Sequence, residues 1–213
     1  SIFIKMKNEP KNILIVRTDR IGDLILTLPL AGLIKKQYPD SRVSFLVREY
    51  TKNIVSNHPY VDEVIVLKES DGNVPLFENV NIIKQKKFDT CIVVYPRFKI
   101  SLIVFFSGIK NRIGTGYRWY SFLFNRKVYE HRKNAERHEL EYNVNLLEKL
   151  GVKTNISDSS VSYDFRVDES SLQNVIRILI DEKINLQKPI IIVHPGSGGS
   201  SIDLPINKFA ELV

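Results

Sequence analysis

The stretch from Asn12 to Pro29, NILIVRTDRIGDLILTLP, decides the fold. It opens with a continuous apolar run, Ile13 to Val16, and turns through a short polar loop, Thr18 to Asp23. It then continues with apolar residues at helical spacing. A buried strand that leads through a loop into a helix is how α/β folds present a binding loop at the carboxyl edge of a sheet. The stretch therefore predicts an α/β protein with a binding loop at this point.

Expected strands and helices alternate outward from this stretch. Pro29 lies inside the first expected helix and should kink it or lie near its first turns. The expected strands cover residues 12–17, 41–47, 63–67, 89–95 and 110–116, and the expected helices cover 22–37, 49–57, 76–87, 100–106 and 135–150. Residues 118–124 (RWYSFLF) are rich in aromatics, which favours core or interface packing over a ligand platform. The alternation predicts right-handed crossovers and a parallel sheet.

A second unit of similar pattern follows a polar, serine-rich stretch. Asp168 is the expected N-cap of a helix that ends near Ile180. A buried strand is expected at Pro189 to Val193 and leads into a loop with three glycines; a further helix is expected from Pro205. The two units resemble each other as two Rossmann-like domains would.

This pattern predicts an N-terminal Rossmann-like domain over residues 1–160. Residues 161–213 are expected to form a linker and an incomplete second Rossmann-like domain. Because the chain begins at Ser1 and ends at Val213 inside an expected helix, we interpret it as a fragment.

The composition limits the class of protein. The chain has 213 residues, 43% of them hydrophobic, which is enough for a sizeable core. Its one cysteine, Cys91, permits no intramolecular disulfide and fits a reducing cytoplasm. The first residues lack a signal-peptide core, and no apolar run approaches the roughly 20 residues that span a bilayer. We expect a soluble protein.

The formal charge of +7 has several interpretations. A basic balance fits nucleic acid, an anionic membrane surface or an anionic substrate, and it also fits scattered solvated lysines. Zinc-finger spacing, a basic zipper and RNA-binding aromatic motifs are missing, so no nucleic-acid partner is expected.

The glycine-rich loop HPGSGGSS, His194 to Ser201, could hold phosphate. Glycines let backbone amides approach an anion closely, and the start of the next helix adds its positive dipole end. The loop matches neither a Walker loop nor the dinucleotide GxGxxG pattern, and a flexible turn is the alternative interpretation. The candidate phosphate-binding residues are Gly196, Ser197, Gly198, Gly199, Ser200 and Ser201.

Two carboxylates lie in the first loop. Asp19 is expected to cap the helix. Asp23 lies near the first helical turn, where the dipole also favours a carboxylate. Because Gly22 beside it has no side chain, there is room for a ligand, and Asp23 could act as a general base towards a hydroxyl.

Arginines are expected at strand ends or in the loops after them. Loops at the carboxyl edge of such a sheet converge on one cleft, and arginine suits a two-pronged hold on carboxylate or phosphate. Ordinary surface arginine is the alternative for each of them. The six are Arg17, Arg20, Arg48, Arg97, Arg112 and Arg118.

Other chemistries have little support in the sequence. His58 and His138 stand alone, and no cluster has metal-ligand spacing, so no protein-bound metal is expected. A nucleophile elbow and a Ser-His-Asp pattern are also missing.

Four motifs in this order and spacing resemble glycosyltransferase family 9, the ADP-heptose:lipopolysaccharide heptosyltransferases and their relatives. They are RTDRIGDLILTLP, NHPYVDEVIVL, RHELEYNVNLLEKLG and IIIVHPGSGGSSIDLPINKFAEL, which together extend over nearly the whole chain. The resemblance implies a GT-B fold, in which two Rossmann-like domains face a cleft with the acceptor on the first and the nucleotide-sugar on the second.

The resemblance also implies a reaction: inverting, metal-independent transfer of a heptose or related sugar, without a cofactor. Gly22-Asp23 matches the family's Gly-Asp motif, so Asp23 would deprotonate the acceptor hydroxyl. The glycine-rich loop would lie near the donor phosphates. The six arginines would hold an anionic glycolipid acceptor, such as a phosphorylated or Kdo-bearing lipid A core. We expect cytoplasmic location, with peripheral contact to the inner membrane surface.

One departure from the family pattern leaves alternatives open. Family members usually carry a lysine shortly after the glycine-rich loop, where this chain has Ile202. That lysine would offset charge on the leaving diphosphate. Alternatives are therefore a relative that transfers another sugar in surface-polysaccharide synthesis, or an inactive glycan-binding fragment. Because the family's second domain continues well beyond Val213, this chain by itself is expected to be inactive.

Overall fold

The computed structural model describes residues 9–70, 72–130, 137–152, 161–194, 196 and 205–211. The chain divides into two compact units, Ser1–Arg166 and Val167–Val213.

The first unit is built on a six-stranded sheet in the order β3-β2-β1-β4-β5-β6, with every neighbouring pair parallel. The strands are β1 (Asn12–Val16), β2 (Arg42–Val47), β3 (Glu63–Val66), β4 (Thr90–Val93), β5 (Asn111–Thr115) and β6 (Arg126–Val128). The order is that of a doubly wound Rossmann sheet, in which the direction of winding reverses between β1 and β4. The expected α/β parallel sheet is confirmed.

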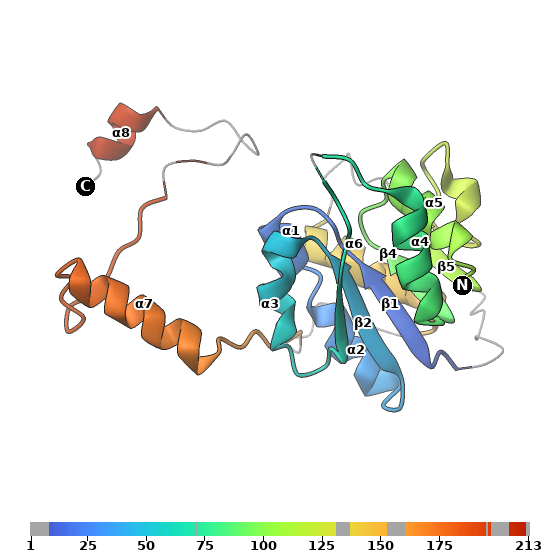
Figure 1. Ribbon diagram of the computed structural model, residues 1–213, viewed down its shortest axis with the longest axis horizontal. Helices are drawn as coiled ribbons and strands as arrows, with labels where there is room; N and C mark the ends of the chain where they lie inside the picture. The colour runs from blue at the N-terminus through green and yellow to red at the C-terminus, as the bar shows by residue number, and fades with distance from the viewer. Residues whose placement is uncertain are drawn as a thin grey trace. The chain divides into compact units, whose positions relative to one another are not determined.

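Helices cover both faces of the sheet (Figure 1). One face carries α1 (Ile21–Ile25), α2 (Pro29–Gln37), the 3-10 turn η1 (Glu49–Thr51) with α3 (Lys52–Ser56), and α6 (Glu139–Asn145) with the 3-10 turn η4 (Leu146–Leu150). The other face carries α4 (Leu76–Gln85) and α5 (Phe98–Phe106), which pack side by side, and near them the 3-10 turn η2 (Ser121–Leu123).

Strand β1 lies at the centre and is apolar on both sides. Ile13 and Ile15 face the core beneath α2 and α6, whereas Leu14 and Val16 face the core beneath α4 and α5. A parallel strand that is covered on both faces has apolar residues at every position, which explains the continuous apolar run from Ile13 to Val16.

Pro29 divides the first expected helix in two. α1 ends at Ile25, and Pro29 is the first residue of α2. Proline is favoured at that position because the missing N–H would have no helical partner there. The expectation that Pro29 lies in the first turns of a helix is confirmed.

The helix expected over 135–150 is shorter than predicted; residues 135 and 136 lie outside the described residues. α6 begins after His138, whose side chain accepts from the Leu140 backbone N–H while the Glu141 side chain accepts from the His138 N–H. The chain then tightens into η4, and Gly151 ends it with a left-handed backbone (φ 87°).

The second unit contains α7 (Glu169–Asp181) and α8 (Ile206–Ala210). Asp168 caps α7 as predicted, since its Oδ1 accepts from the Ser171 N–H at 2.8 Å. The hydroxyls of Ser170 and Ser171 also donate to this carboxylate, and the three hydrogen bonds hold the pKa of Asp168 far below its usual range. The strand expected at Pro189 to Val193 is wrong, because these residues form no strand and Ile191 and Ile192 are 87% exposed. A strand needs a neighbour to satisfy its backbone, and the described part of this unit contains none.

Candidate functional site

A cavity of about 540 Å³ opens at the carboxyl ends of β1, β4, β5 and β6. This is where the winding of the sheet reverses, the place where doubly wound sheets bind ligands. The lining comes from five separate stretches of chain: Arg17, Asp19, Asp23, Val93, Val94, Tyr95, Pro96, Thr115, Tyr117, Arg118, Val128, Glu130, Glu139 and Leu146.

Arg17 is the buried centre of this cavity. It follows directly after β1, and its side chain is only 2% exposed. Its guanidinium contacts three carboxylates: Nε donates to Asp19 at 2.6 Å, and the terminal nitrogens lie 3.0 Å from Asp23 and 3.4 Å from Glu139. A buried charge needs such partners, since a lone one costs several kcal/mol.

Two further groups fix the position of the Arg17 guanidinium. Its carbon lies 5.6 Å from the centre of the Tyr95 ring, which provides a cation–π contact. Asn143 accepts from Nη1 at 3.5 Å and donates through its own amide to the Leu26 carbonyl at 3.0 Å. α6 is thus tied to the turn that follows α1.

Asp23 is the third residue of α1, and its carboxylate is 34% exposed. One oxygen contacts Arg17, while the side chain remains open to the cavity. A Cβ at Gly22 would meet nothing within 4 Å, so the space beside Asp23 is open. A carboxylate held on one side and open on the other suits a base towards an entering hydroxyl.

Asp19 does not cap α1, contrary to expectation. Arg20 is the N-cap residue, and no side chain caps this helix. Asp19 instead accepts from Arg17, and its backbone carbonyl accepts from the Tyr50 hydroxyl. Burial raises the pKa of Asp19 above its usual value, although the Arg17 charge and hydrogen bond oppose this shift.

Two acidic residues of the cavity, Glu139 and Glu130, are not among the site residues expected from the sequence. Glu139 is the first residue of α6 and contacts Arg17. Glu130 accepts from Asn145 at 2.6 Å and from Arg137 at 3.1 Å. Glu139 lies within the motif RHELEYN, which offered the one signal that could have found it.

Among the described residues, the lining therefore holds four carboxylates and two guanidiniums, those of Arg17 and Arg118. Arg17, which is expected from the sequence to bind the acceptor, is buried among three carboxylates, and one of its terminal nitrogens lies 3.0 Å from Asp23. An acid-lined cavity suits a hydroxyl-rich sugar better than a phosphate.

The other arginines are spread around the first unit. Arg118 lines the cavity, and Arg97 lies exposed with its guanidinium 5.4 Å from the Tyr95 ring centre. Arg20 is exposed at the start of α1. Arg48 follows β2 and pairs with Glu69 at 2.9 Å, which raises the pKa of Arg48 further.

The position expected for Arg112, at the end of a strand or in the loop after it, is wrong. Arg112 is the second residue of β5 and lies towards the amino edge of the sheet, away from the carboxyl-edge loops. Its guanidinium donates to the carbonyls of Leu123 and Ile109 at 2.8 and 2.6 Å. It holds the turn η2 in place and does not line the cavity.

Of the six candidate phosphate-binding residues, the structure describes Gly196, which is exposed. Ser197, Gly198, Gly199, Ser200 and Ser201 lie outside the described residues, as does Ile202. Within the described ranges, no group of three or more His, Cys, Asp or Glu side chains could hold a metal ion. No helix in those ranges is long and apolar enough to cross a membrane.

Comparisons with known proteins agree with this architecture. Residues 79–213 match the sequence profile of glycosyltransferase family 9 (heptosyltransferase). A provisionally named glycosyltransferase of Haemophilus influenzae is 28% identical over 205 residues, which are 95% of this chain and 59% of that protein. The chain thus spans about 59% of the length of this relative.

Solved structures share the fold. The family 9 glycosyl transferase of Veillonella parvula superimposes with a TM-score of 0.82 at 21% identity, over 98% of this chain and 60% of the other. Escherichia coli ADP-heptose LPS heptosyltransferase II gives 0.72 at 20% identity, over 95% and 60%. These neighbours confirm the expected fold of the GT-B type.

Proposed function

Since the chain belongs to glycosyltransferase family 9, we propose that the protein it represents transfers a heptose from ADP-heptose to a lipopolysaccharide core acceptor. The E. coli structural neighbour is named for that donor and that acceptor class, which supports the proposal. The observation that carries it is the Asp23 carboxylate, held at 3.0 Å by the buried Arg17 and open to the cavity.

Asp23 acts as the general base. Its free oxygen takes the proton of an acceptor hydroxyl that enters the cavity, and the hydroxyl oxygen attacks the anomeric carbon of the donor. The bond between that carbon and the diphosphate oxygen breaks on the opposite face, so the configuration inverts. Arg17 keeps the carboxylate aimed into the cavity throughout.

The two domains divide the substrates. Residues 1–160 form the acceptor side, and residues 161–213 begin the nucleotide-sugar side, with the loop Gly196–Ser201 near the donor phosphates. The acid-rich cavity receives the hydroxyl-bearing sugar of the acceptor. Arg118 in the cavity lining and the exposed Arg97 and Arg20 would bind its anionic groups. No metal ion or cofactor takes part in this reaction.

The test replaces Asp23 by asparagine in the full-length gene product. Asp23→Asn keeps the size of the side chain and removes the base, so kcat is expected to fall by about 10²- to 10⁴-fold. Binding of ADP, measured by calorimetry, should not change. Asp40→Asn, in the exposed turn after α2, is the matched control. Full turnover by Asp23→Asn would remove Asp23 as the base.

Ile202 supports a second candidate, a glycan-binding protein without transferase activity. A lysine at this position would offset charge on the leaving diphosphate. If Ile202→Lys and the unchanged protein are both inactive with a panel of nucleotide-sugars, the binding-only function is favoured. If the unchanged protein is active, the panel identifies the sugar and the binding-only function is excluded.

A further inference from the structure

Asn143 is an uncharged polar residue in the core of the first unit. It lies in α6 and is 0% exposed. A buried amide needs partners at both ends, since an unpaired polar group in a core costs stability. Its partners are 116 to 126 residues away along the chain, just after β1 and in the turn between α1 and α2. Asn143 therefore connects α6 to the stretch that contains Asp23.

One end of the amide contacts the cation that holds Asp23. Nη1 of Arg17 lies 3.4 Å from Glu139 and donates to Oδ1 of Asn143 at 3.5 Å. Glu139 and Asn143 are four residues apart, so they lie on the same face of α6. The other terminal nitrogen of Arg17, Nη2, lies 3.0 Å from the Asp23 carboxylate. Because the guanidinium is planar and rigid, a group that fixes Nη1 also fixes the direction of Nη2.

The other end of the amide is connected to the backbone of Asp23. Nδ2 of Asn143 donates to the Leu26 carbonyl at 3.0 Å and to the Thr27 hydroxyl at 3.5 Å. That hydroxyl donates in turn to the Asp23 carbonyl at 2.9 Å. Thr27 is also 0% exposed, so water has little access to these groups. Asn143 is thus connected to Asp23 twice, through the side chain of Asp23 and through its backbone.

An amide is well suited to this place. Its oxygen faces an N–H donor and its nitrogen faces two oxygens, so this orientation of the amide satisfies every group around it. An aspartate would place a carboxylate oxygen against the Leu26 carbonyl. A leucine would leave the groups on both sides without this partner.

We propose that Asn143 is a positioning residue for Asp23. It acts through Arg17 and Thr27, which together hold the carboxylate in one direction, and it does not itself line the cavity. This inference rests on the proposed role of Asp23 as the base, because a base must meet the acceptor hydroxyl at hydrogen-bond distance. A displacement of about 1 Å is enough to slow such a step by about 100-fold.

The test compares Asn143→Ala with the unchanged full-length gene product, with ADP-heptose and a lipopolysaccharide core acceptor as the probes. We expect kcat to fall by about 10- to 100-fold while the KM for the acceptor changes little, because Asn143 orients the base and does not bind substrate. In the Asp23→Asn background, Asn143→Ala should lower kcat no further, since no base remains to be positioned. A fall in kcat in both backgrounds would indicate a purely structural role and would overturn the proposal.

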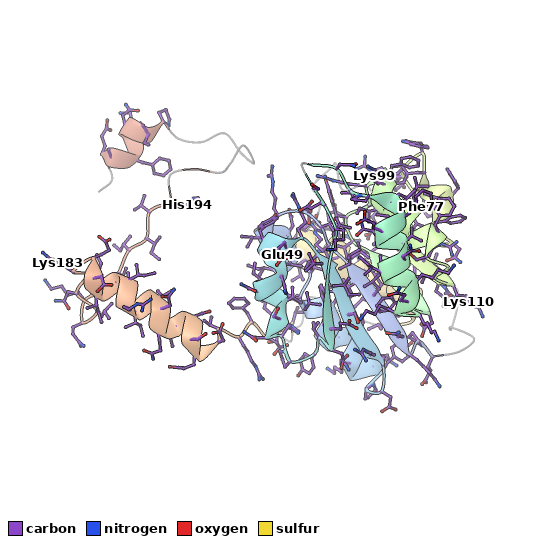
Figure 2. All side chains as sticks on the ribbon, viewed as in Figure 1. Glu49, Phe77, Lys99, Lys110, Lys183 and His194 are labelled. Atoms are coloured by element: carbon purple, nitrogen blue, oxygen red, sulfur yellow. The ribbon has the colours of Figure 1, made fainter. Side chains whose placement is uncertain are left out.

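Asn79→Ala is the matched control. Asn79 is also a buried asparagine, 1% exposed, and its amide likewise bonds to the backbone, at Lys68 and Pro75. It belongs to α4, on the other face of the sheet from α6, and Figure 2 shows Phe77 of the same helix at the surface. Both substitutions should lower the melting temperature, but only Asn143→Ala should lower kcat. Equal losses of kcat in the two variants would overturn the proposal.

Thr27→Val tests the connection to the backbone without opening a cavity. Valine has the shape of threonine but lacks the hydroxyl that donates to the Asp23 carbonyl. The kcat of this variant should fall about tenfold, whereas Thr27→Ser, which keeps the hydroxyl, should retain most of the activity. If Asn143→Ala does not fold, these two variants decide, and an equal kcat in both would overturn the proposal.

A measurement without turnover completes the test. Exchange of the Arg17 side-chain N–H protons with water is followed by NMR in the 213-residue chain. It should be about tenfold faster in Asn143→Ala than in Asn79→Ala, because Nη1 loses a buried acceptor. Equal exchange rates would overturn the proposal even where no sugar is transferred. Full turnover by Asp23→Asn would remove the proposed base, whereas full turnover by Asn143→Ala beside an inactive Asp23→Asn would overturn the positioning role alone.

Discussion

Arg17 joins parts of the chain that lie far apart in sequence. Its partner Glu139 is 122 residues away, yet the two side chains meet at the carboxyl edge of the sheet. Removal of one member of a buried ion pair leaves its partners uncompensated, which is more damaging than the loss of attraction alone. The stability of the first unit and the orientation of the Asp23 carboxylate therefore both depend on the Arg17 guanidinium.

Arg17→Met is expected to lower the free energy of unfolding by about 3 kcal/mol, because Asp19 would keep its burial without its cation. Urea unfolding followed by circular dichroism measures the change. Arg118→Ala, which removes an exposed guanidinium from the same cavity, should cost less than about 0.5 kcal/mol. Equal losses of unfolding free energy in the two variants would contradict the conclusion that the buried Arg17 stabilises the first unit more than the exposed Arg118 does.

His58 makes the first unit sensitive to acid. Its Nε2–H donates to the Tyr163 carbonyl at 3.1 Å, and its Nδ1 accepts from the Tyr60 N–H at 3.3 Å, so the neutral ring satisfies both partners. Burial lowers the pKa of His58, and Arg166 adds to this, whereas Asp164 and the Tyr163 hydrogen bond oppose it.

Because the folded state takes up the proton less readily than the unfolded state, stability is greatest above the unfolded pKa of about 6.5 and falls as the pH drops below it. His58→Gln should be less stable at pH 7.5 but lose less on acidification. Melting temperatures of both proteins across this range give the comparison. If the melting temperatures of the two proteins fall equally with decreasing pH, His58 does not cause the loss of stability in acid.

At the level of elements, β5 and its loop contain two glycines with different surroundings. A Cβ on Gly114 would come within 2.9 Å of the ring of Phe124, which is 1% exposed and cannot move aside. A Cβ on Gly116 would also meet a ring, that of Tyr129, but this ring is 62% exposed and free to swing away.

Gly114→Ala is therefore expected to cost about 1–3 kcal/mol through overpacking of the core. Gly116→Ala should cost well under that amount, since only an exposed ring has to turn. The denaturant midpoints of the two variants measure which substitution lowers the stability more. A larger loss for Gly116→Ala would mean that Tyr129 is held more firmly than its exposure indicates.

Elements that are stabilised by their own pattern were predictable from the sequence. Strand β1 reads as apolar on both faces, and Asp168 supplies the cap of α7 locally. Elements that depend on neighbours were not. β6 has only three residues, RKV, and is a strand because β5 pairs with it, whereas PIIIV at 189–193 has the composition of a strand but no partner in the described unit.

The site was predictable to a similar extent. Asp23 and its loop could be located because the loop follows a recognisable strand. The acidic surroundings of Arg17 could not be predicted, since Glu139 reaches it only through the packing of α6 across the sheet. For the same reason Arg112 was misplaced, because its position within β5 and its carbonyl partners depend on the fold of η2.

At the level of the whole molecule, the two units differ in how they are stabilised. Both apolar cores of the first unit are made entirely of residues between Ile13 and Tyr163. In α7 no residue is buried, and Ile178, Ile191 and Ile192 are all at least half exposed. A unit that buries so little apolar surface cannot offset its own loss of chain entropy.

A chain that ends at Arg166 is therefore expected to unfold at the same temperature as the 213-residue chain, within about 1 °C, and with equal cooperativity. It should also stay monomeric at concentrations where the longer chain associates, because the exposed run Ile190 to Val193 is absent. Calorimetry and sedimentation of the two chains measure both effects. A clear fall in melting temperature on truncation would show that the second unit contributes to the stability of the first, and the fold would then have to be treated as a single cooperative structure.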